Sequence, residues 1–339
     1  MDPTTVQRLV KSSDGVEIFA EASGDKVNPH VVLTHGLAFS GAVFDEFCKR
    51  EDIMSRLYIV RIDMRGHGRS GMPDTPEGHL SHLYAADFKA VVDAFGLKRP
   101  VLVGWSQSFV WSPYIPLLTM FQGVLGADIC THLGSESLSG VFYLSSLSDL
   151  SLVATAGIIT DQAGAILLRA SNSETTSAAM ADFARTAFAS PSARALTYRE
   201  RCFYGGMGAL QPQDVRTLAY MREQDKTQLF DAMRGGMPVF AMYGTSDGLV
   251  KGAVMHEALR REGVAKAEVL SMEGLGHALF WERPDDTAET VIGFVERVWK
   301  KEGSVTPWGH SISRTTSLVV THRAIHVGLP THLNVAGRR

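Results

Sequence analysis

The sequence predicts an α/β fold with a mostly parallel central sheet and helices on both faces of that sheet. Short apolar runs that read as buried strands alternate with segments of helical periodicity, such as residues 80–95 and 288–299. The chain has 339 residues, of which 45% are hydrophobic, so it can bury a sizeable core. One large α/β domain with an inserted segment accounts for this pattern.

Five apolar runs indicate strands, and each ends in small or polar residues. They are residues 31–34, 100–103, 141–144, 238–243 and 267–270. Between residues 150 and 236 the strand signals stop and an alanine-rich helical pattern takes over. We therefore predict a core in two parts, residues 1–149 and 237–303, with a helical cap at 150–236 between strands six and seven.

The composition argues against several classes of partner. With 33 basic and 36 acidic residues, the formal net charge is −3, which gives no electrostatic reason to expect nucleic acid or an anionic membrane. Cys48, Cys130 and Cys202 are widely spaced and odd in number, so they form no metal-ligand or redox pair and favour a reducing compartment. The first residues show no signal-peptide pattern. We expect a cytoplasmic protein.

A candidate nucleophile follows the second of these strands. Residues 104–108 read Gly-Trp-Ser-Gln-Ser, close to the G-x-S-x-G elbow in which a strained strand-to-helix turn presents a serine hydroxyl above the sheet. The last small residue is Ser108 instead of glycine, a modest departure. Ser106 is therefore the predicted nucleophile.

Partners for this serine follow later strands. In elbow proteins the chain order is serine, then Asp or Glu, then His. Asp247 follows the strand at 238–243, and His277 follows the strand at 267–270. Both lie beyond the carboxyl ends of strands, where open α/β sheets place their sites. We predict Asp247 as the acid and His277 as the base, with Asp149 as the alternative acid.

The chain resembles the α/β-hydrolase superfamily, and most of all its esterase and cofactor-free haloperoxidase-like branch. The matching segments follow one another in the family's order: residues 35–37, 63–70, 104–108, 243–247 and 276–282. The resemblance spans roughly residues 14–301. It implies an α/β-hydrolase fold and a serine hydrolase without cofactor or metal, acting on a small or medium ester-like molecule.

The resemblance also implies how the site residues divide the work. Ser106 would attack the carbonyl, His277 would move the proton and Asp247 would hold the imidazole. The backbone N–H groups of Leu37 and Gln107 would form the oxyanion hole. Perhydrolysis by the same residues is one alternative, and a non-catalytic protein of this fold is another. Epoxide hydrolase or dehalogenase chemistry is disfavoured because the elbow carries serine, not aspartate.

Other polar residues near the strand ends are expected to have structural roles. Asp63, Arg65 and His67 are expected to build a turn, since the glycines between and after them permit unusual backbone angles. His35 is expected to shape the oxyanion loop without acting as a base.

The segment directly behind the elbow departs from a normal helix start. Residues 109–122 contain Pro113 and Pro116, and a proline inside a helix costs roughly 3 kcal/mol. From Gly123 onward the small residues expected behind a nucleophile resume. We interpret 109–122 as an in-frame insertion of 14 residues, such as a retained intron, that inactivates the chain. The alternative is a genuine substrate loop.

The tail at 304–339 has no Asp or Glu and no sustained periodicity. Its four histidines lack ligand spacing, so they predict no metal site. We expect disorder there, or translation past the natural end, and no catalytic role.

Overall fold

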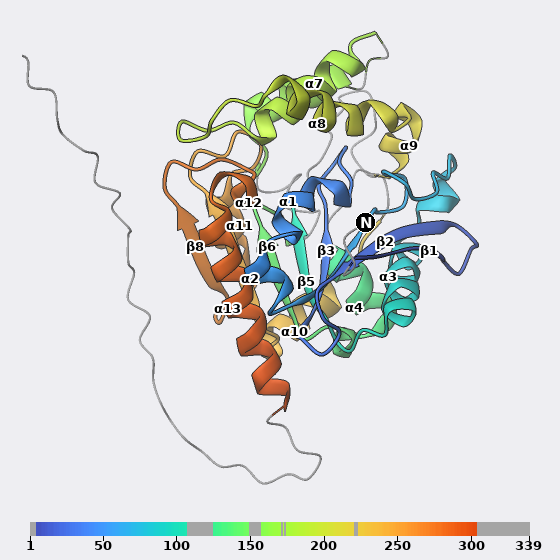
Figure 1. Ribbon diagram of the computed structural model, residues 1–339, viewed down its shortest axis with the longest axis vertical. Helices are drawn as coiled ribbons and strands as arrows, with labels where there is room; N and C mark the ends of the chain where they lie inside the picture. Colours follow the sequence, from blue (N-terminus) through green and yellow to red (C-terminus); the bar gives the residue numbers. More distant parts are fainter. Residues whose placement is uncertain are drawn as a thin grey trace, which may run out of the picture. The chain divides into compact units, whose positions relative to one another are not determined.

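The sheet has the mostly parallel topology that the sequence predicts (Figure 1). The computed structural model describes residues 5–106, 125–148, 157–170, 172, 174–219 and 223–303. Within these ranges eight strands form one sheet in the order β1-β2-β4-β3-β5-β6-β7-β8. The parallel strands are β3 (His30–Thr34), β4 (Tyr58–Ile62), β5 (Val101–Trp105), β6 (Gly140–Leu144), β7 (Val239–Gly244) and β8 (Glu268–Met272). At one side of the sheet, the edge strand β1 (Val6–Lys11) pairs antiparallel with β2 (Glu17–Ser23), and β2 pairs antiparallel with β4.

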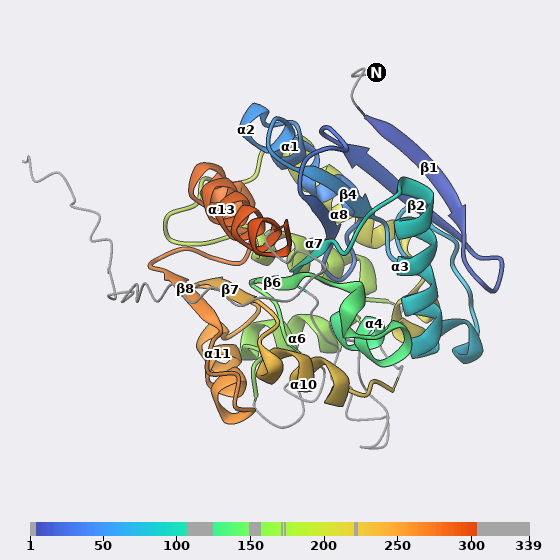
Figure 2. The ribbon, with the colours of Figure 1, turned by 90° about the horizontal axis from the view of Figure 1, so that it is seen from below.

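Helices cover both faces of the sheet, which also confirms the prediction (Figure 2). One face carries α1 (Asp45–Cys48), α2 (Glu51–Met54) and α13 (Pro284–Gly303). The other carries α3 (Ser81–Phe95), α4 (Leu125–Leu133), α10 (Thr227–Gly235) and α11 (Gly252–Arg261). None of the helices described is both long and apolar enough to cross a membrane.

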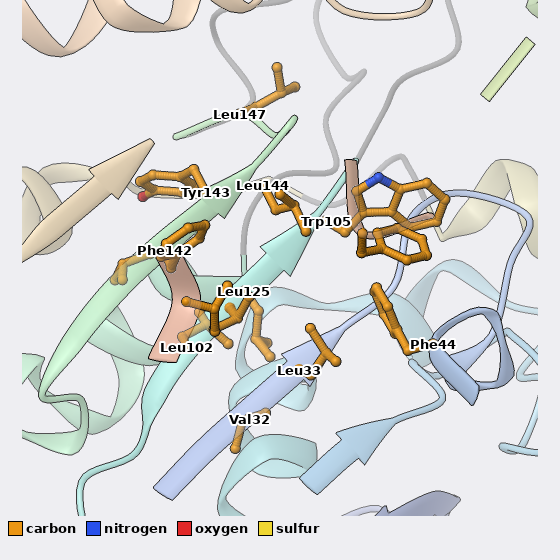
Figure 3. Close-up of a cluster of buried hydrophobic side chains, with 14 of the residues drawn as sticks. Val32, Leu33, Phe44, Leu102, Trp105, Leu125, Phe142, Tyr143, Leu144 and Leu147 are labelled. Carbon is orange, nitrogen blue, oxygen red and sulfur yellow. The ribbon is translucent and has the colours of Figure 1, made fainter. Parts of the chain in front are cut away.

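The core lies between these layers, where strands buried on both faces supply almost continuous apolar runs. The rings of Phe142 on β6 and Phe240 on β7 stack with centroids 4.8 Å apart. Phe294 of α13 packs edge-on against both rings, at 5.7 Å from each. Figure 3 shows that this packing continues through β3 and β5 up to Trp105 at the end of β5. The same core therefore supports the strand ends that carry the candidate site.

Between β6 and β7 the chain forms the predicted helical cap. Its helices are α6 (Asp161–Ala170), α7 (Thr176–Ala187), α8 (Tyr198–Leu210) and α9 (Gln213–Leu218). A capping box starts α8: the Thr197 hydroxyl accepts the Glu200 N–H, and the Glu200 carboxylate accepts the Thr197 N–H. Helix α10 follows these helices and packs against α4. In Figure 1 the helices α7, α8 and α9 lie across one end of the parallel strands.

The cap is attached to loops of the core at several points. Near its start, the Thr160 hydroxyl donates to the Gly248 carbonyl at 2.5 Å. Near its end, the Gln211 side-chain amide donates to the Gly66 carbonyl at 2.7 Å. Gly248 lies beside Asp247, and Gly66 lies within the turn at 63–70. The cap is thus fastened to the same loops that carry the candidate site residues.

The candidate insertion at 109–122 and the tail at 304–339 lie outside the described residues. The described residues end at Ser106 before this candidate insertion and resume after it at Leu125, the first residue of α4. Helix α4 is held against α3 by the Ser81 hydroxyl, which donates to the Asp128 carboxylate at 2.6 Å.

Candidate active site

Ser106 lies directly after β5 in a backbone conformation that an L-residue rarely adopts. Its φ is +63°, in the left-handed region, and its side chain is fully buried. Its N–H donates to the Leu144 carbonyl at 3.2 Å, which fixes the turn to the neighbouring strand. A Cβ on Gly36 would lie 2.5 Å from Ser106 Cβ and 2.7 Å from Oγ. Only glycine at position 36 therefore lets the oxyanion loop approach the serine this closely.

Asp247 and His277 form a buried pair. Asp247 Oδ2 lies 2.7 Å from His277 Nδ1, and the two side chains are 1% and 0% exposed. The other carboxylate oxygen, Oδ1, accepts the N–H groups of Leu249 at 2.7 Å and Val250 at 2.9 Å. The carboxylate can therefore rotate little, and it fixes the proton of the imidazole on Nδ1.

The second ring nitrogen, His277 Nε2, is buried and has no hydrogen-bond partner among the residues described. With the proton on Nδ1, this nitrogen carries a lone pair, so it can accept a proton. Within the described residues, no hydrogen bond joins it to Ser106 Oγ.

The loops that carry Asp247 and His277 are fastened to each other. A Cβ on Gly244 would lie 2.2 Å from the Leu275 carbonyl oxygen, so the two loops touch where no side chain fits. The Ser246 N–H donates to the same carbonyl at 2.8 Å. This contact fixes Asp247 and His277 relative to one another although they lie 30 residues apart in the chain.

Trp105 connects the turn at Ser106 with His277. Its indole N–H donates to the His277 carbonyl at 3.0 Å, and the two rings lie 5.4 Å apart. The indole packs among Phe39 at 5.1 Å and Phe280 at 5.0 Å. Sequence reasoning missed this role, because the elbow motif leaves the position before the serine open and only the folded chain brings it to His277.

His35 makes hydrogen bonds to the main chain of the loop that carries Leu37, the candidate oxyanion donor. Nδ1 of His35 donates to the Gly36 carbonyl at 2.7 Å, and Nε2 accepts the Met64 N–H at 3.0 Å. Burial lowers the pKa of His35, so the ring is neutral and both nitrogens are occupied by the main chain. Leu37 follows in this loop and is buried, whereas Gln107, the other expected oxyanion donor, lies outside the described residues.

Asp63 organises the turn at 63–70. Its carboxylate accepts the N–H groups of Gly41 at 2.7 Å and Arg69 at 2.9 Å, and Arg69 Nε at 2.8 Å. A Cβ on Gly68 would lie 2.4 Å from the same carboxylate. These contacts account for Asp63 as a structural group.

Arg65 and His67 are also buried. The Arg65 guanidinium is fully buried and makes two hydrogen bonds of 2.7 Å with the Asp87 carboxylate. Burial, with His35 nearby, lowers the pKa of His67 well below its usual 6.5. Neither side chain belongs to the Asp247–His277 pair.

A second serine in a left-handed conformation ends the neighbouring strand. The ladder pairs Trp105 with Leu144, so Ser145 is the register neighbour of Ser106, and its φ is +45°. The Ser145 hydroxyl is buried without a hydrogen-bond partner among the residues described. Asp149, the alternative acid, follows shortly afterwards but lies outside the described residues.

Solved structures of similar fold include several esterases. A putative aryl esterase from Burkholderia cenocepacia has a TM-score of 0.72 at 19% identity, covering 87% of this chain and 100% of that one. The esterase RhEst1 from Rhodococcus sp. ECU1013 also has a TM-score of 0.72, at 20% identity, covering 86% of this chain and 99% of that one. At these identities the likeness establishes the fold.

Curated relatives match shorter segments. The probable oxidoreductase EphD of Mycobacterium bovis is 37% identical over 114 residues, which are 32% of this chain and 19% of the relative. The non-heme chloroperoxidase of Streptomyces lividans is 37% identical over 98 residues, 29% of this chain and 34% of the relative. The chain thus matches about a fifth to a third of these relatives' lengths.

A family model described as the alpha/beta hydrolase family matches residues 31–290, which include β4 to β8, all of β3 except its first residue, and all of the candidate site residues. Together with the sheet order and the cap between β6 and β7, this match confirms the resemblance seen in the sequence. The chain belongs to the α/β-hydrolase family.

Proposed function

We propose that this protein is a serine hydrolase that cleaves a small or medium ester-like substrate through an acyl-enzyme. The observation that carries the proposal is the buried Asp247–His277 pair, whose Nε2 has no partner among the described residues. Ser106 complements it, because a left-handed serine directly after a strand is the geometry of a nucleophile elbow. The esterases among the structures of similar fold support the same reaction class.

In the proposed reaction, His277 Nε2 takes the proton of Ser106 Oγ as this oxygen attacks the ester carbonyl. Asp247 stabilises the imidazolium that forms and keeps its orientation. The Leu37 and Gln107 N–H groups would stabilise the oxyanion of the tetrahedral intermediate. The alcohol leaves with the proton from His277, and water, activated by the same nitrogen, releases the acid.

The part of the cap that covers the loop around Leu37 suits an apolar substrate. Helix α8 packs on the oxyanion loop so closely that a Cβ on Gly208 would lie 3.3 Å from Ala38 Cβ. Beside this contact, the Ser40 hydroxyl donates to the Met207 sulfur at 3.7 Å. The Tyr204 ring stacks on Phe188 at 4.1 Å. Burial raises the pKa of Tyr204 to about 12, so its phenol group stays neutral.

Perhydrolysis is the second candidate reaction. It uses the same acyl-enzyme, with hydrogen peroxide in place of water as the second nucleophile. The observation that favours it is the 37% identity with a non-heme chloroperoxidase over 98 residues. Assaying peracid formation beside ester hydrolysis distinguishes the two.

The test of the proposed nucleophile is covalent labelling with a fluorophosphonate, followed by identification of the labelled peptide. We expect the label on Ser106. Ser106→Ala should abolish it and lower turnover of p-nitrophenyl esters by roughly four to six orders of magnitude, because triad residues act as a unit. Ser145→Ala is the matched control, since it removes the neighbouring strained serine, and it should keep the label. A folded wild-type sample that takes no label would contradict the proposal and favour a non-catalytic protein.

A further inference from the structure

The connection between α7 and α8 lies against the loop that precedes His277. The Ser190 hydroxyl donates to Glu282 Oε2 at 2.5 Å, and the Ser192 hydroxyl donates to the Gly274 carbonyl at 3.3 Å. A Cβ on Gly276 would lie 2.6 Å from the Ala189 carbonyl oxygen. The cap therefore touches the main chain directly next to the base, at a point where only glycine fits.

Glu282 is the group that these two segments share. It ends α12 (Leu279–Glu282), and both of its carboxylate oxygens lie 3.1 Å from the Gly276 nitrogen, whose N–H they accept. No cation pairs with it within the part of the chain that the structure describes. Within the described residues, the carboxylate accepts hydrogen bonds from one peptide N–H and from the Ser190 hydroxyl, and hydrogen bonds to an ionised carboxylate are stronger than neutral ones.

The main chain around His277 is consequently held on both sides. Glu282 fixes the peptide N–H of the preceding residue, and the Trp105 indole fixes the carbonyl of His277 itself at 3.0 Å. Between these two contacts the direction of the imidazole is set by the backbone and by Asp247. Of the three contacts, the one through Glu282 is also hydrogen-bonded to the cap, through Ser190.

We propose that Glu282 is a positioning residue for the catalytic base and that Ser190 links it to the cap. The carboxylate holds the Gly276 peptide, the peptide sets the direction of His277, and the cap holds the carboxylate. This inference rests on the proposed role of His277 as the base. Neither Glu282 nor Ser190 needs to touch the substrate for a change in either to alter turnover.

The test compares four variants by their kcat and KM on a p-nitrophenyl ester. Glu282→Ala removes both contacts, and its kcat should fall by up to about 100-fold with a smaller change in KM, because small displacements of a catalytic group have effects of that size. Glu282→Gln keeps an oxygen for the Gly276 N–H and should retain most of kcat. Ser190→Ala removes the contact with the cap alone and should lower kcat less than Glu282→Ala.

Ser192→Ala is the matched control. It deletes a hydroxyl from the same connection, which also contacts the loop before the base, but it leaves Glu282 untouched. We expect its kcat to stay near that of the wild type. If Glu282→Ala kept wild-type kcat, or if Glu282→Gln lost as much as Glu282→Ala, positioning by these hydrogen bonds would be refuted.

A second measurement separates this inference from the proposed reaction. Hydrogen–deuterium exchange of the peptide that contains Gly276 reports the contact whether or not the protein turns over an ester. Exchange should be faster in Glu282→Ala and in Ser190→Ala than in the wild type and Ser192→Ala. An inactive wild type would contradict the proposed function, whereas unchanged exchange in both variants would overturn the link between cap and base.

Discussion

Trp105 shows how one side chain can serve both the packing and the site. Its ring lies among Phe39, Phe44 and Phe280, with centroid distances of 5.1, 5.9 and 5.0 Å. Its polar edge meets the His277 carbonyl at 3.0 Å. Buried tryptophans usually find a partner for the indole N–H, and here that partner is the main chain of the candidate base.

Trp105→Phe tests this contact at the level of a single residue. Phenylalanine keeps an aromatic ring among its neighbours but leaves the buried His277 carbonyl without its donor. We expect the free energy of unfolding to fall by about 1–3 kcal/mol and fluorophosphonate labelling to slow. Urea denaturation and labelling kinetics measure the two effects. Trp281→Phe, at a half-buried tryptophan outside the elbow, is the control, and equal behaviour of the two variants would argue against a special role for Trp105.

At the scale of the elements, the apolar runs predicted five of the six parallel strands. Four of them, β3, β5, β6 and β7, are buried on both faces and therefore read as almost continuous apolar runs, whereas the edge strand β8 is only partly buried. Strand β4 escaped recognition, since Arg61 interrupts its apolar run. In the structure this guanidinium is buried and forms ion pairs with Glu21 and with Asp45, the latter at 2.6 Å. Because the acidic partners of Arg61 lie far away in the sequence, the sequence alone shows only a charged residue, which argues against a buried strand.

The candidate site was likewise predictable in part. Ser106, Asp247 and His277 each follow a strand, so strand ends alone bring them to one edge of the sheet. Trp105 and Glu282 act through main-chain groups of the base loop, at contacts of 3.0 and 3.1 Å. Any residue offers a peptide group, so neither contact has a sequence pattern from which it could be predicted.

A further prediction at this scale concerns residues 109–122, the insertion that was inferred from the sequence. Helix α4 is anchored to α3 by the 2.6 Å contact between Ser81 and Asp128 on the far side of this segment. We expect that deleting 109–122 joins the elbow directly to the residues before α4 and raises both activity and soluble yield. Esterase assays and transcript sequencing check this. A deletion variant that folds well but turns over ester more slowly would identify the segment as part of the site.

At the scale of the whole molecule, buried histidines link stability to pH. His35 and His67 are 3% and 4% exposed, and burial lowers the pKa of both, that of His67 well below 6.5. Below that pH the unfolded chain binds protons that the folded chain does not, so the free energy of unfolding decreases as the pH falls. The decrease continues until the folded histidines protonate, and each contributes at most about 1.4 kcal/mol per pH unit.

Thermal denaturation between about pH 7.5 and pH 5 should therefore show Tm decreasing with acidification, starting near the ordinary histidine pKa. His67→Gln should flatten this decrease, because it removes one of the two groups. His82→Gln, at an exposed histidine, should leave the slope unchanged. A Tm that is constant or rises over this range would contradict the assignment of neutral buried rings.

The hydrogen bonds between the cap and the core loops also affect how such a protein can be engineered. Thr160 contacts the loop of Asp247, Ser190 contacts the loop of His277 through Glu282, and Gln211 contacts the turn at 63–70. Exchanging caps between relatives would therefore also exchange groups that support the candidate acid and the candidate base. A functional chimera would need the matching core loops from the same donor, so the natural unit for grafting is the cap together with these three loops.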